Sequence, residues 1–307
     1  MTTVFIDGSA GTTGLRIRER LADRKDLQLM ILPEDLRKDP SARADALNSA
    51  DVSFLCLPDA AAVEAASFVT DPHAVIIDTS TAHRTAAGWT YGMPELTGQR
   101  EKIARAKRIA NPGCHATGFI ALVAPLVENG LLSSDVRLSA FSLTGYSGGG
   151  KKMIAEYEAP DTDPLYLAPR QYGLGQTHKH LPEMSAVCGL QHAPVFCPIV
   201  APYYAGMEVT VPLTPADTSA SPEEIRKVYR DYYRSGLIRF AEAPDENGFL
   251  SAGAMAGRDS LEVSVFGNGE RILLISRFDN LGKGASGAAI QNMNIALGLD
   301  EAEGLVK

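Results

Sequence analysis

Short apolar runs alternate with helix-like stretches through about the first 115 residues. The runs occupy residues 4–7, 27–32, 52–58 and 74–78. Continuous apolar runs of this length are typical of strands buried on both faces, and strands that alternate with helices indicate a doubly wound parallel sheet. The pattern predicts an α/β, Rossmann-like domain, in which ligands bind beyond the carboxyl ends of the strands.

From about residue 135 apolar and polar positions alternate instead. The strand-like runs are 136–143, 207–213, 261–267 and 271–278. A period of two indicates strands with one covered and one open face, so we expect an α+β domain on an antiparallel sheet. Helices are expected at 151–158 and 222–234. Because an open sheet face packs on helices or on another subunit, a homodimer or homotetramer is expected.

A glycine-rich turn follows the first apolar run, at residues 8–14, and an amphipathic helix follows the turn. Glycines in this setting let the backbone approach a phosphate, which the helix N-terminus then favours. The spacing is G-x-x-G-x-x-G rather than the commoner G-x-G-x-x-G. It predicts a dinucleotide site, with a simple turn as the alternative.

The second apolar run leads into residues 33–38, which hold acidic and basic side chains. An acidic residue here binds the ribose of NAD, whereas an arginine accommodates the 2′-phosphate of NADP. Arg37 and Lys38 favour NADP, and a solvated charged loop is the alternative. Near the C-terminus, residues 279–294 are glycine-rich and then helical, with small residues that would let this helix return to the nucleotide domain. We expect a nucleotide domain of residues 1–115 with 280–307 and a catalytic and oligomerisation domain of 116–279.

The 307-residue chain has an ordinary globular composition, with 45% hydrophobic and 21% charged residues. Its net charge of −8 offers no electrostatic footprint for nucleic acid or an anionic membrane, so small molecules and other subunits are the expected partners. No signal-peptide pattern and no run of roughly 18 apolar residues is present. The four cysteines lack C-x-x-C spacing, so reduced thiols, a cytoplasmic location and no zinc site are expected.

Residues 111–114 form an Asn-Pro-Gly-Cys turn ahead of a helix-like run at 119–127. This places Cys114 at or near a helix N-terminus, where unpaired N–H groups and the helix dipole favour a nucleophilic thiolate. A small buried hydrophobe is the alternative. The loop follows a candidate strand, as the glycine loop does, so we expect the nucleophile to lie beside the cofactor.

Two further segments carry chemistry. In residues 144–152, Ser147, Gly148 and Lys151 suit a phosphate or carboxylate, and a mobile linker is the alternative. In residues 178–183, a helix opened by Pro182 would put His180 at its N-cap and Glu183 in its first turn, close enough to orient the imidazole. Such a histidine could take a proton from a thiol or give one to an alkoxide. His178 and His180 lack a third metal ligand nearby.

These segments together resemble the short subfamily of N-acetyl-gamma-glutamyl-phosphate reductases. The matching segments are residues 8–14, 78–84, 91–96, 111–117, 145–151, 178–183 and 280–294. They follow the family's order over nearly the full length. One departure from the longer subfamily is His115, where Phe or Tyr usually follows the cysteine.

The resemblance implies that the Cys114 thiolate attacks an acyl phosphate, that phosphate leaves, and that NADPH reduces the thioester to N-acetyl-glutamate semialdehyde in arginine biosynthesis. His180 is the implied acid or base, with His178 as the alternative. The implied NADP contacts are Gly8, Ser9, Gly11, Thr12, Thr13, Gly14, Arg37 and Asn280. The expected substrate contacts are Arg84, Asn111, Ser147, Gly148, Lys151 and Glu183.

Two other functions fit parts of this pattern. An aspartate-semialdehyde dehydrogenase shares the architecture and the thiol chemistry. A non-catalytic protein that senses a dinucleotide would keep the glycine loop but would leave Cys114 unreactive.

Overall fold

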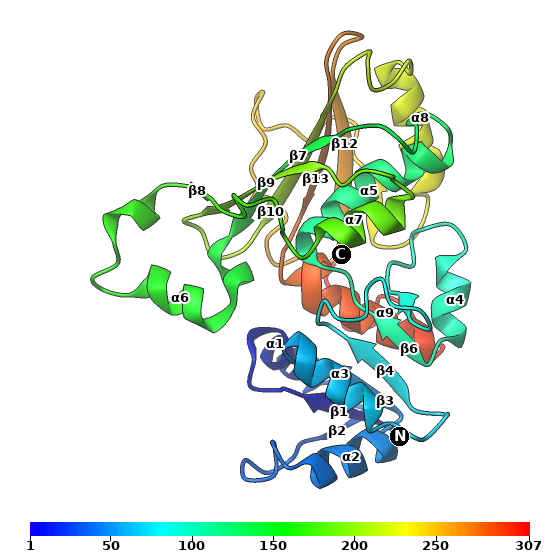
Figure 1. Cartoon of the computed structure of the whole chain (residues 1–307), viewed down its shortest axis with the longest axis vertical. Coiled ribbons are helices and arrows are strands. Elements are labelled where there is room, and N and C mark those ends of the chain that lie inside the picture. The colour runs from blue at the N-terminus through cyan, green and yellow to red at the C-terminus, as the bar shows by residue number, and fades with distance from the viewer. The chain divides into compact units, whose positions relative to one another are not determined.

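The computed structural model describes all residues from 1 to 307, and the chain divides into two compact units. One comprises Met1–Pro112 with Ala285–Leu305, and the other comprises Gly113–Gly284 with Val306–Lys307. The blue and cyan part of the chain and the red helix near its C-terminus make up the first unit (Figure 1). No helix is both long and apolar enough to cross a membrane.

The N-terminal unit is built on a six-stranded sheet in the order β2-β1-β3-β4-β6-β5, and every neighbouring pair is parallel. The strands are β1 (Thr2–Asp7), β2 (Leu27–Met30), β3 (Val52–Leu55), β4 (Val75–Asp78), β5 (Thr90–Tyr91) and β6 (Arg108–Ala110). The helices are α1 (Thr12–Leu21), α2 (Pro40–Ser49), α3 (Asp59–Ser67), α4 (Gln99–Arg105) and α9 (Gly287–Ala296). The predicted doubly wound parallel sheet is confirmed.

Both faces of this sheet are covered, which explains the continuous apolar runs. Val4 of β1 packs in a core with Met293 of α9, whereas Phe5 packs in a second core with Leu47 of α2. Successive strand residues point to opposite faces, so both must be apolar. The return of α9 to this unit confirms the expected path of the C-terminal helix.

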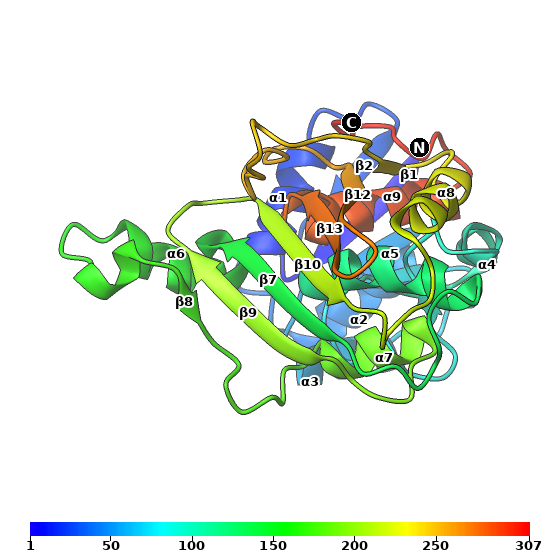
Figure 2. The same cartoon turned by 90° about the horizontal axis from the view of Figure 1, so that it is seen from above.

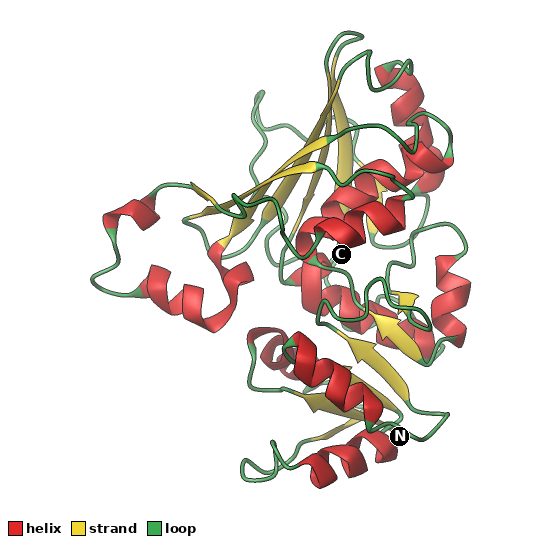
Figure 3. Ribbon diagram, in the orientation of Figure 1, coloured by secondary structure: helices red, strands yellow, loops and turns green.

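The C-terminal unit is built on a seven-stranded sheet in the order β11-β12-β13-β10-β7-β9-β8. Its strands are β7 (Ser139–Gly145), β8 (Arg170–Gln171), β9 (Val195–Ala201), β10 (Met207–Leu213), β11 (Ile238–Phe240), β12 (Leu261–Gly267) and β13 (Ile272–Phe278). Its helices are α5 (Cys114–Glu128), α6 (Gly150–Glu158), α7 (Leu181–Cys188) and α8 (Pro222–Tyr232), and a π-helical turn spans Gly282–Ser286 at the boundary between the units. Figure 3 separates these helices from the strands by colour.

The sheet of the C-terminal unit is mixed rather than wholly antiparallel. The pairs β7–β9 and β11–β12 are parallel, and the other neighbours are antiparallel. Alternation fixes which face a residue occupies but not the direction of the neighbouring strand, so the sequence could not show this. Long strands β9, β7 and β10 lie side by side in Figure 2.

One face of this sheet is covered by α5, and part of the opposite face is open. Gly118 of α5 lies so close to the sheet that an added Cβ would come within 2.5 Å of Val209 on β10. On the other face, Phe141, Val195 and Leu273 are 44%, 58% and 40% exposed. The sheet therefore keeps an apolar surface that this chain does not cover.

Helix α5 contains a proline, and a neighbouring helix compensates for it. Pro125 has no N–H group, so the carbonyl of Ala121, four residues earlier, loses its helical partner. The Tyr233 hydroxyl, just beyond α8, donates to that carbonyl at 2.7 Å, and Tyr229 donates to the Leu122 carbonyl at 2.6 Å. These two tyrosines tie α8 to the buried helix that carries Cys114 at its start.

We predict that Tyr233→Phe lowers the free energy of unfolding by about 1–2 kcal/mol, because the buried Ala121 carbonyl loses its donor. Denaturant unfolding measures the change. Tyr232→Phe is the matched control, since the Tyr232 hydroxyl bonds the exposed Glu128 carboxylate, and it should cost less than about 0.5 kcal/mol. Equal losses in the two variants would contradict the assigned role of Tyr233.

Candidate active site

Cys114 is the first residue of α5, directly after the N-cap residue Gly113. Its side chain is half-buried, and it lies against Gly284, where an added Cβ would come within 3.0 Å of the Cys114 Cβ. The unpaired N–H groups of the first helical turn favour negative charge at this end of α5. By contrast, burial raises the pKa of Cys56 to about 12 and that of Cys188 further still, so these two thiols stay protonated.

Glu183 anchors the turn that presents Cys114. It is buried in the first turn of α7, and its Oε1 accepts a hydrogen bond from the Gly113 N–H at 2.8 Å. The sequence predicts that this carboxylate orients the His180 ring, and the hydrogen bond to Gly113 adds a second task, that of holding the backbone before Cys114. A carboxylate at a helix N-terminus is also favoured by the helix dipole.

Two predicted imidazoles lie together at the start of α7. The rings of His178 and His180 are 4.8 Å apart, and each is 5.6 Å from the ring of His115. His180 is the N-cap residue of α7, and its backbone N–H donates to His178 Nδ1 at 3.2 Å. When neutral, His178 therefore carries its proton on Nε2. His178 is half-buried and His180 is buried.

Sequence reasoning gave no role to His115, Tyr172 or Ser142, which form a hydrogen-bonded chain in this unit. His115 Nδ1 lies 2.7 Å from Ser142 Oγ, and its Nε2 lies 2.6 Å from the Tyr172 hydroxyl. Burial, with a smaller effect of nearby His178, lowers the pKa of His115 to about 3, so this ring is neutral at physiological pH. Its position directly after Cys114 was the only signal in the sequence.

The predicted anion loop lies beside Asn280. Asn280 donates to Ser147 Oγ at 2.9 Å and accepts from the Gly206 N–H at 2.9 Å, and both side chains are buried. Gly148 is next to them, since an added Cβ would lie 3.5 Å from Asn280 Nδ2. Lys151 is on the exposed surface of α6, so the structure groups Ser147, Gly148 and Asn280 but not the lysine.

The glycine loop of the N-terminal unit has the geometry of a phosphate cradle. Gly8 has a φ of +84°, and a Cβ there would lie 2.3 Å from the Cys56 carbonyl oxygen, so only glycine fits. A Cβ on Gly14 would meet the Gly8 carbonyl oxygen at 2.5 Å. Gly11 is the N-cap residue of α1, and Thr12 and Thr13 are the first two residues of that helix, directly after the loop.

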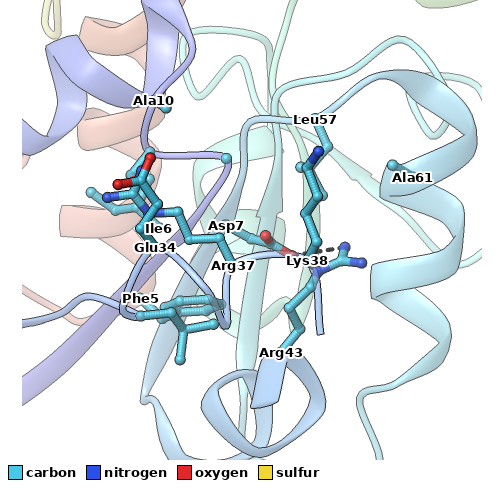
Figure 4. A pocket seen from close by; sticks show the side chains of 13 residues that line it. Phe5, Ile6, Asp7, Ala10, Glu34, Arg37, Lys38, Arg43, Leu57 and Ala61 are labelled. Atoms are coloured by element: carbon cyan, nitrogen blue, oxygen red, sulfur yellow. Dashed lines mark hydrogen bonds and ion pairs between the residues drawn. The ribbon is translucent and has the colours of Figure 1, made fainter. Parts of the chain in front are cut away.

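A cavity of about 620 Å³ adjoins this loop (Figure 4). Its lining includes Gly8, Ser9, Glu34, Arg37, Lys38 and Arg43. Arg43 is already paired with Asp7 and with Glu64, at 3.0 Å in each case. Two buried guanidinium nitrogens of these lining residues, Arg37 Nε and Arg43 Nη2, have no hydrogen-bond partner. The cavity and the loop fit a dinucleotide with an anionic group near Arg37.

Arg84 and Asn111 lie together in the N-terminal unit. The Arg84 Nε donates to the Asn111 carbonyl at 3.0 Å, and its Nη2 donates to the Thr79 carbonyl at 3.3 Å. The buried Asn111 amide donates to the Ala285 carbonyl at 3.1 Å and accepts from Asn292 at 3.2 Å. Asn111 thus bonds Asn292 on α9 and Ala285, which lies two residues before α9 begins. Across the chain, no group of three or more His, Cys, Asp or Glu side chains is arranged to hold a metal ion.

Two family models match the two units. The semialdehyde dehydrogenase NAD-binding domain matches residues 9–106, and the semialdehyde dehydrogenase dimerisation domain matches residues 114–280. The chain is 45% identical over 321 residues to N-acetyl-gamma-glutamyl-phosphate reductase 2 of Nostoc sp., with 98% of each chain covered. It is 44% identical over 309 residues to the Burkholderia cenocepacia (strain J2315) reductase, again with 98% of each covered.

The chain belongs to the N-acetyl-gamma-glutamyl-phosphate reductase family. Its fold is also similar to that of aspartate semialdehyde dehydrogenase II of Vibrio cholerae, with a TM-score of 0.71 at 16% identity over 97% of this chain and 98% of that one. The NADP complex of the Candida albicans aspartate semialdehyde dehydrogenase gives 0.69 at 14% identity, over 96% and 99%. In this reductase family the N-terminal unit is the domain for a nicotinamide dinucleotide.

We predict that acid destabilises the folded protein through His115. Between about pH 6.5 and 3, His115 binds a proton in the unfolded chain but stays neutral in the folded protein, where it is buried. The free energy of unfolding therefore falls by about 1.4 kcal/mol for each pH unit by which the pH drops. In His115→Phe the loss between pH 7 and 5 should be smaller by about 2 kcal/mol, measured by urea unfolding at both pH values. The same loss in variant and wild type would show that His115 is not buried neutral.

Proposed function

We propose that this reductase converts N-acetyl-L-glutamyl 5-phosphate and NADPH into N-acetyl-L-glutamate 5-semialdehyde and phosphate, a step of arginine biosynthesis. The supporting observation is Cys114 at the N-terminus of α5, in the same unit as the His178 and His180 pair, within a chain that matches reductases along 98% of its length. The helix start favours the thiolate that an acyl transfer needs.

In the proposed reaction, the Cys114 sulfur attacks the acyl carbon, the carbon–oxygen bond to phosphate breaks, and a thioester remains. The bound dinucleotide supplies hydride to this centre. The oxygen anion then re-forms the carbonyl as the carbon–sulfur bond breaks, and His180, or His178 as the alternative, which took the thiol proton before the attack, can return it to the released Cys114 sulfur. The pH profiles of turnover in His180→Asn and His178→Asn identify which imidazole carries the proton.

We propose that Ser147, Gly148 and Arg84 bind the substrate's anionic groups, whereas the expected contribution of Lys151 is not supported, because its side chain is exposed on α6. Ser147 accepts its bond from Asn280, so its hydroxyl hydrogen can be donated to a carboxylate or phosphate. Asn111 donates to the Ala285 carbonyl, and Glu183 accepts from the Gly113 N–H directly before Cys114, so we propose that they shape the substrate site. Asn280 stays a proposed NADP contact on the resemblance of residues 280–294 to the reductase family, while its amide bonds Ser147 and the Gly206 N–H.

The dinucleotide is proposed to be NADP, held by Gly8, Ser9, Gly11, Thr12, Thr13, Gly14 and Arg37. Gly8 lets the loop pass tightly against the Cys56 carbonyl, and Gly11 places the N-terminus of α1 at the end of the loop, where a pyrophosphate is favoured. Arg37 lines the cavity beside the loop, and its guanidinium suits the 2′-phosphate that distinguishes NADP from NAD.

The active form is proposed to be a homodimer in which a second copy covers the open face of the seven-stranded sheet. Phe141, Val195 and Leu273 share that face and stay exposed within one chain, and the matching family model describes residues 114–280 as a dimerisation domain. Light scattering should give twice the mass of the chain. Four times that mass indicates the homotetramer instead, and a monomer contradicts the proposal.

We predict that Cys114→Ser lowers NADPH oxidation with N-acetylglutamyl phosphate by on the order of 10⁴-fold, because a serine hydroxyl is a poor nucleophile without a strong base. NADPH binding, measured by fluorescence, should stay within about twofold, which shows that the variant folds. Wild type should use aspartyl phosphate poorly in the same assay. Preference for aspartyl phosphate would favour an aspartate-semialdehyde dehydrogenase, and no turnover of either would favour the sensor.

We predict that Arg37→Ala lowers kcat/KM for NADPH by about 10- to 100-fold, the cost of a lost hydrogen bond to a charged group. The value for NADH should change by less than about threefold. Arg18→Ala, on the exposed side of α1 and outside the cavity, is the matched control. Equal losses for both cofactors would contradict a 2′-phosphate contact at Arg37.

A further inference from the structure

The chain of Ser142, His115 and Tyr172 lies next to the nucleophile but has no part in the reaction described above. Ser142 is on β7 and is fully buried, His115 is the second residue of α5 and is 3% exposed, and Tyr172 follows β8 and is half-buried. The Tyr172 ring is 5.9 Å from the ring of His178. The phenol therefore belongs to the same group of side chains as the proposed acid or base.

The hydrogen atoms in the bonds between Ser142, His115 and Tyr172 can be assigned by counting donors. Neutral His115 carries one N–H, while Ser142 and Tyr172 each carry one O–H. The buried Ser142 hydroxyl has His115 Nδ1 as the side-chain partner that the structure gives it, at 2.7 Å. If His115 donated from Nδ1 instead, the Ser142 hydrogen would be buried without an acceptor, at a cost of about 1–3 kcal/mol.

The favoured arrangement therefore runs in one direction. Ser142 donates to His115 Nδ1, and the Nε2–H of His115 donates to the Tyr172 oxygen at 2.6 Å. This leaves the hydrogen of the half-buried phenol for an acceptor in the site. Tyr172 stays protonated, because burial and the negative charge of a Cys114 thiolate both raise its pKa. It can donate a hydrogen bond but cannot act as a base at neutral pH.

We propose that His115 is a positioning residue, which with Ser142 holds the Tyr172 hydroxyl as a hydrogen-bond donor to the Cys114 thiolate. The donor strengthens the preference for the charged sulfur that the start of α5 already provides. A neutral imidazole suits this task. A protonated His115 would carry a hydrogen on both ring nitrogens, so Ser142 could no longer donate to Nδ1. Its positive charge would also attract the thiolate to His115 rather than to the Tyr172 hydroxyl. The inference rests on the proposed role of Cys114 as the nucleophile.

The test is the pH dependence of Cys114 alkylation by iodoacetamide in the full-length protein without substrate or cofactor, followed by peptide mass spectrometry. Tyr172→Phe should shift the midpoint upward by about 1 to 2 pH units, the equivalent of one hydrogen bond to a charged group. His115→Phe should shift it in the same direction. Ser142→Ala should give a smaller upward shift, because His115 is then free to accept the Tyr172 hydrogen.

Tyr157→Phe is the matched control, since its hydroxyl accepts from Arg170 on the α6 side of the unit, and it should leave the midpoint unchanged. An unchanged midpoint in Tyr172→Phe overturns the proposal. A shift in Tyr172→Phe with none in His115→Phe and Ser142→Ala overturns the positioning role of His115. If His115→Phe does not fold, Ser142→Ala decides that point. Alkylation needs no substrate. A chain that does not reduce N-acetylglutamyl phosphate would therefore contradict the proposed function without deciding whether Tyr172 bonds the Cys114 thiolate.

Discussion

The hydrogen bond between the Glu183 carboxylate and the Gly113 N–H is the contact on which the candidate site depends. It joins the first turn of α7 to the N-cap of α5, so the residues after Gly113 and those before Glu183 are held in one unit. Cys114 and His115 lie on one side of this bond in sequence, and His178 and His180 on the other. Helices α5 and α7 also pack against each other, and this bond fixes the start of α5, where Cys114 lies, relative to the start of α7, where the two imidazoles lie.

Burial of α5 explains why this anchor is needed. Every residue from His115 to Leu126 is buried, including Pro125, so the helix is fixed by packing on the sheet and by the tyrosines at the end of α8. The helix begins with a glycine N-cap that has no side-chain cap. The Glu183 carboxylate from α7 supplies an acceptor for the Gly113 N–H, one of the backbone donors that a helix start leaves without a helical partner.

The sequence predicts the strands, the glycine loop, the place of Cys114 at a helix start and the pairing of His178 with His180, because each of these features has a local pattern. The apolar runs of β1 and β3 and the alternation in β10 follow from which faces are covered. It did not reach the parallel pairing of β7 with β9, or Tyr172 and Ser142, which meet His115 from distant parts of the chain. Contacts across 27 and 57 residues leave no periodic mark in the sequence.

Three imidazoles within 5.6 Å of one another raise an electrostatic problem that burial resolves. If all three rings were protonated, their mutual repulsion would oppose folding at the point where a thiolate must be stabilised. Burial keeps His115 neutral, so it serves as a hydrogen-bond link between Ser142 and Tyr172. Because these two bonds do not involve His178 or His180, the proposed proton transfer by either of those rings leaves the link from Ser142 to Tyr172 in place.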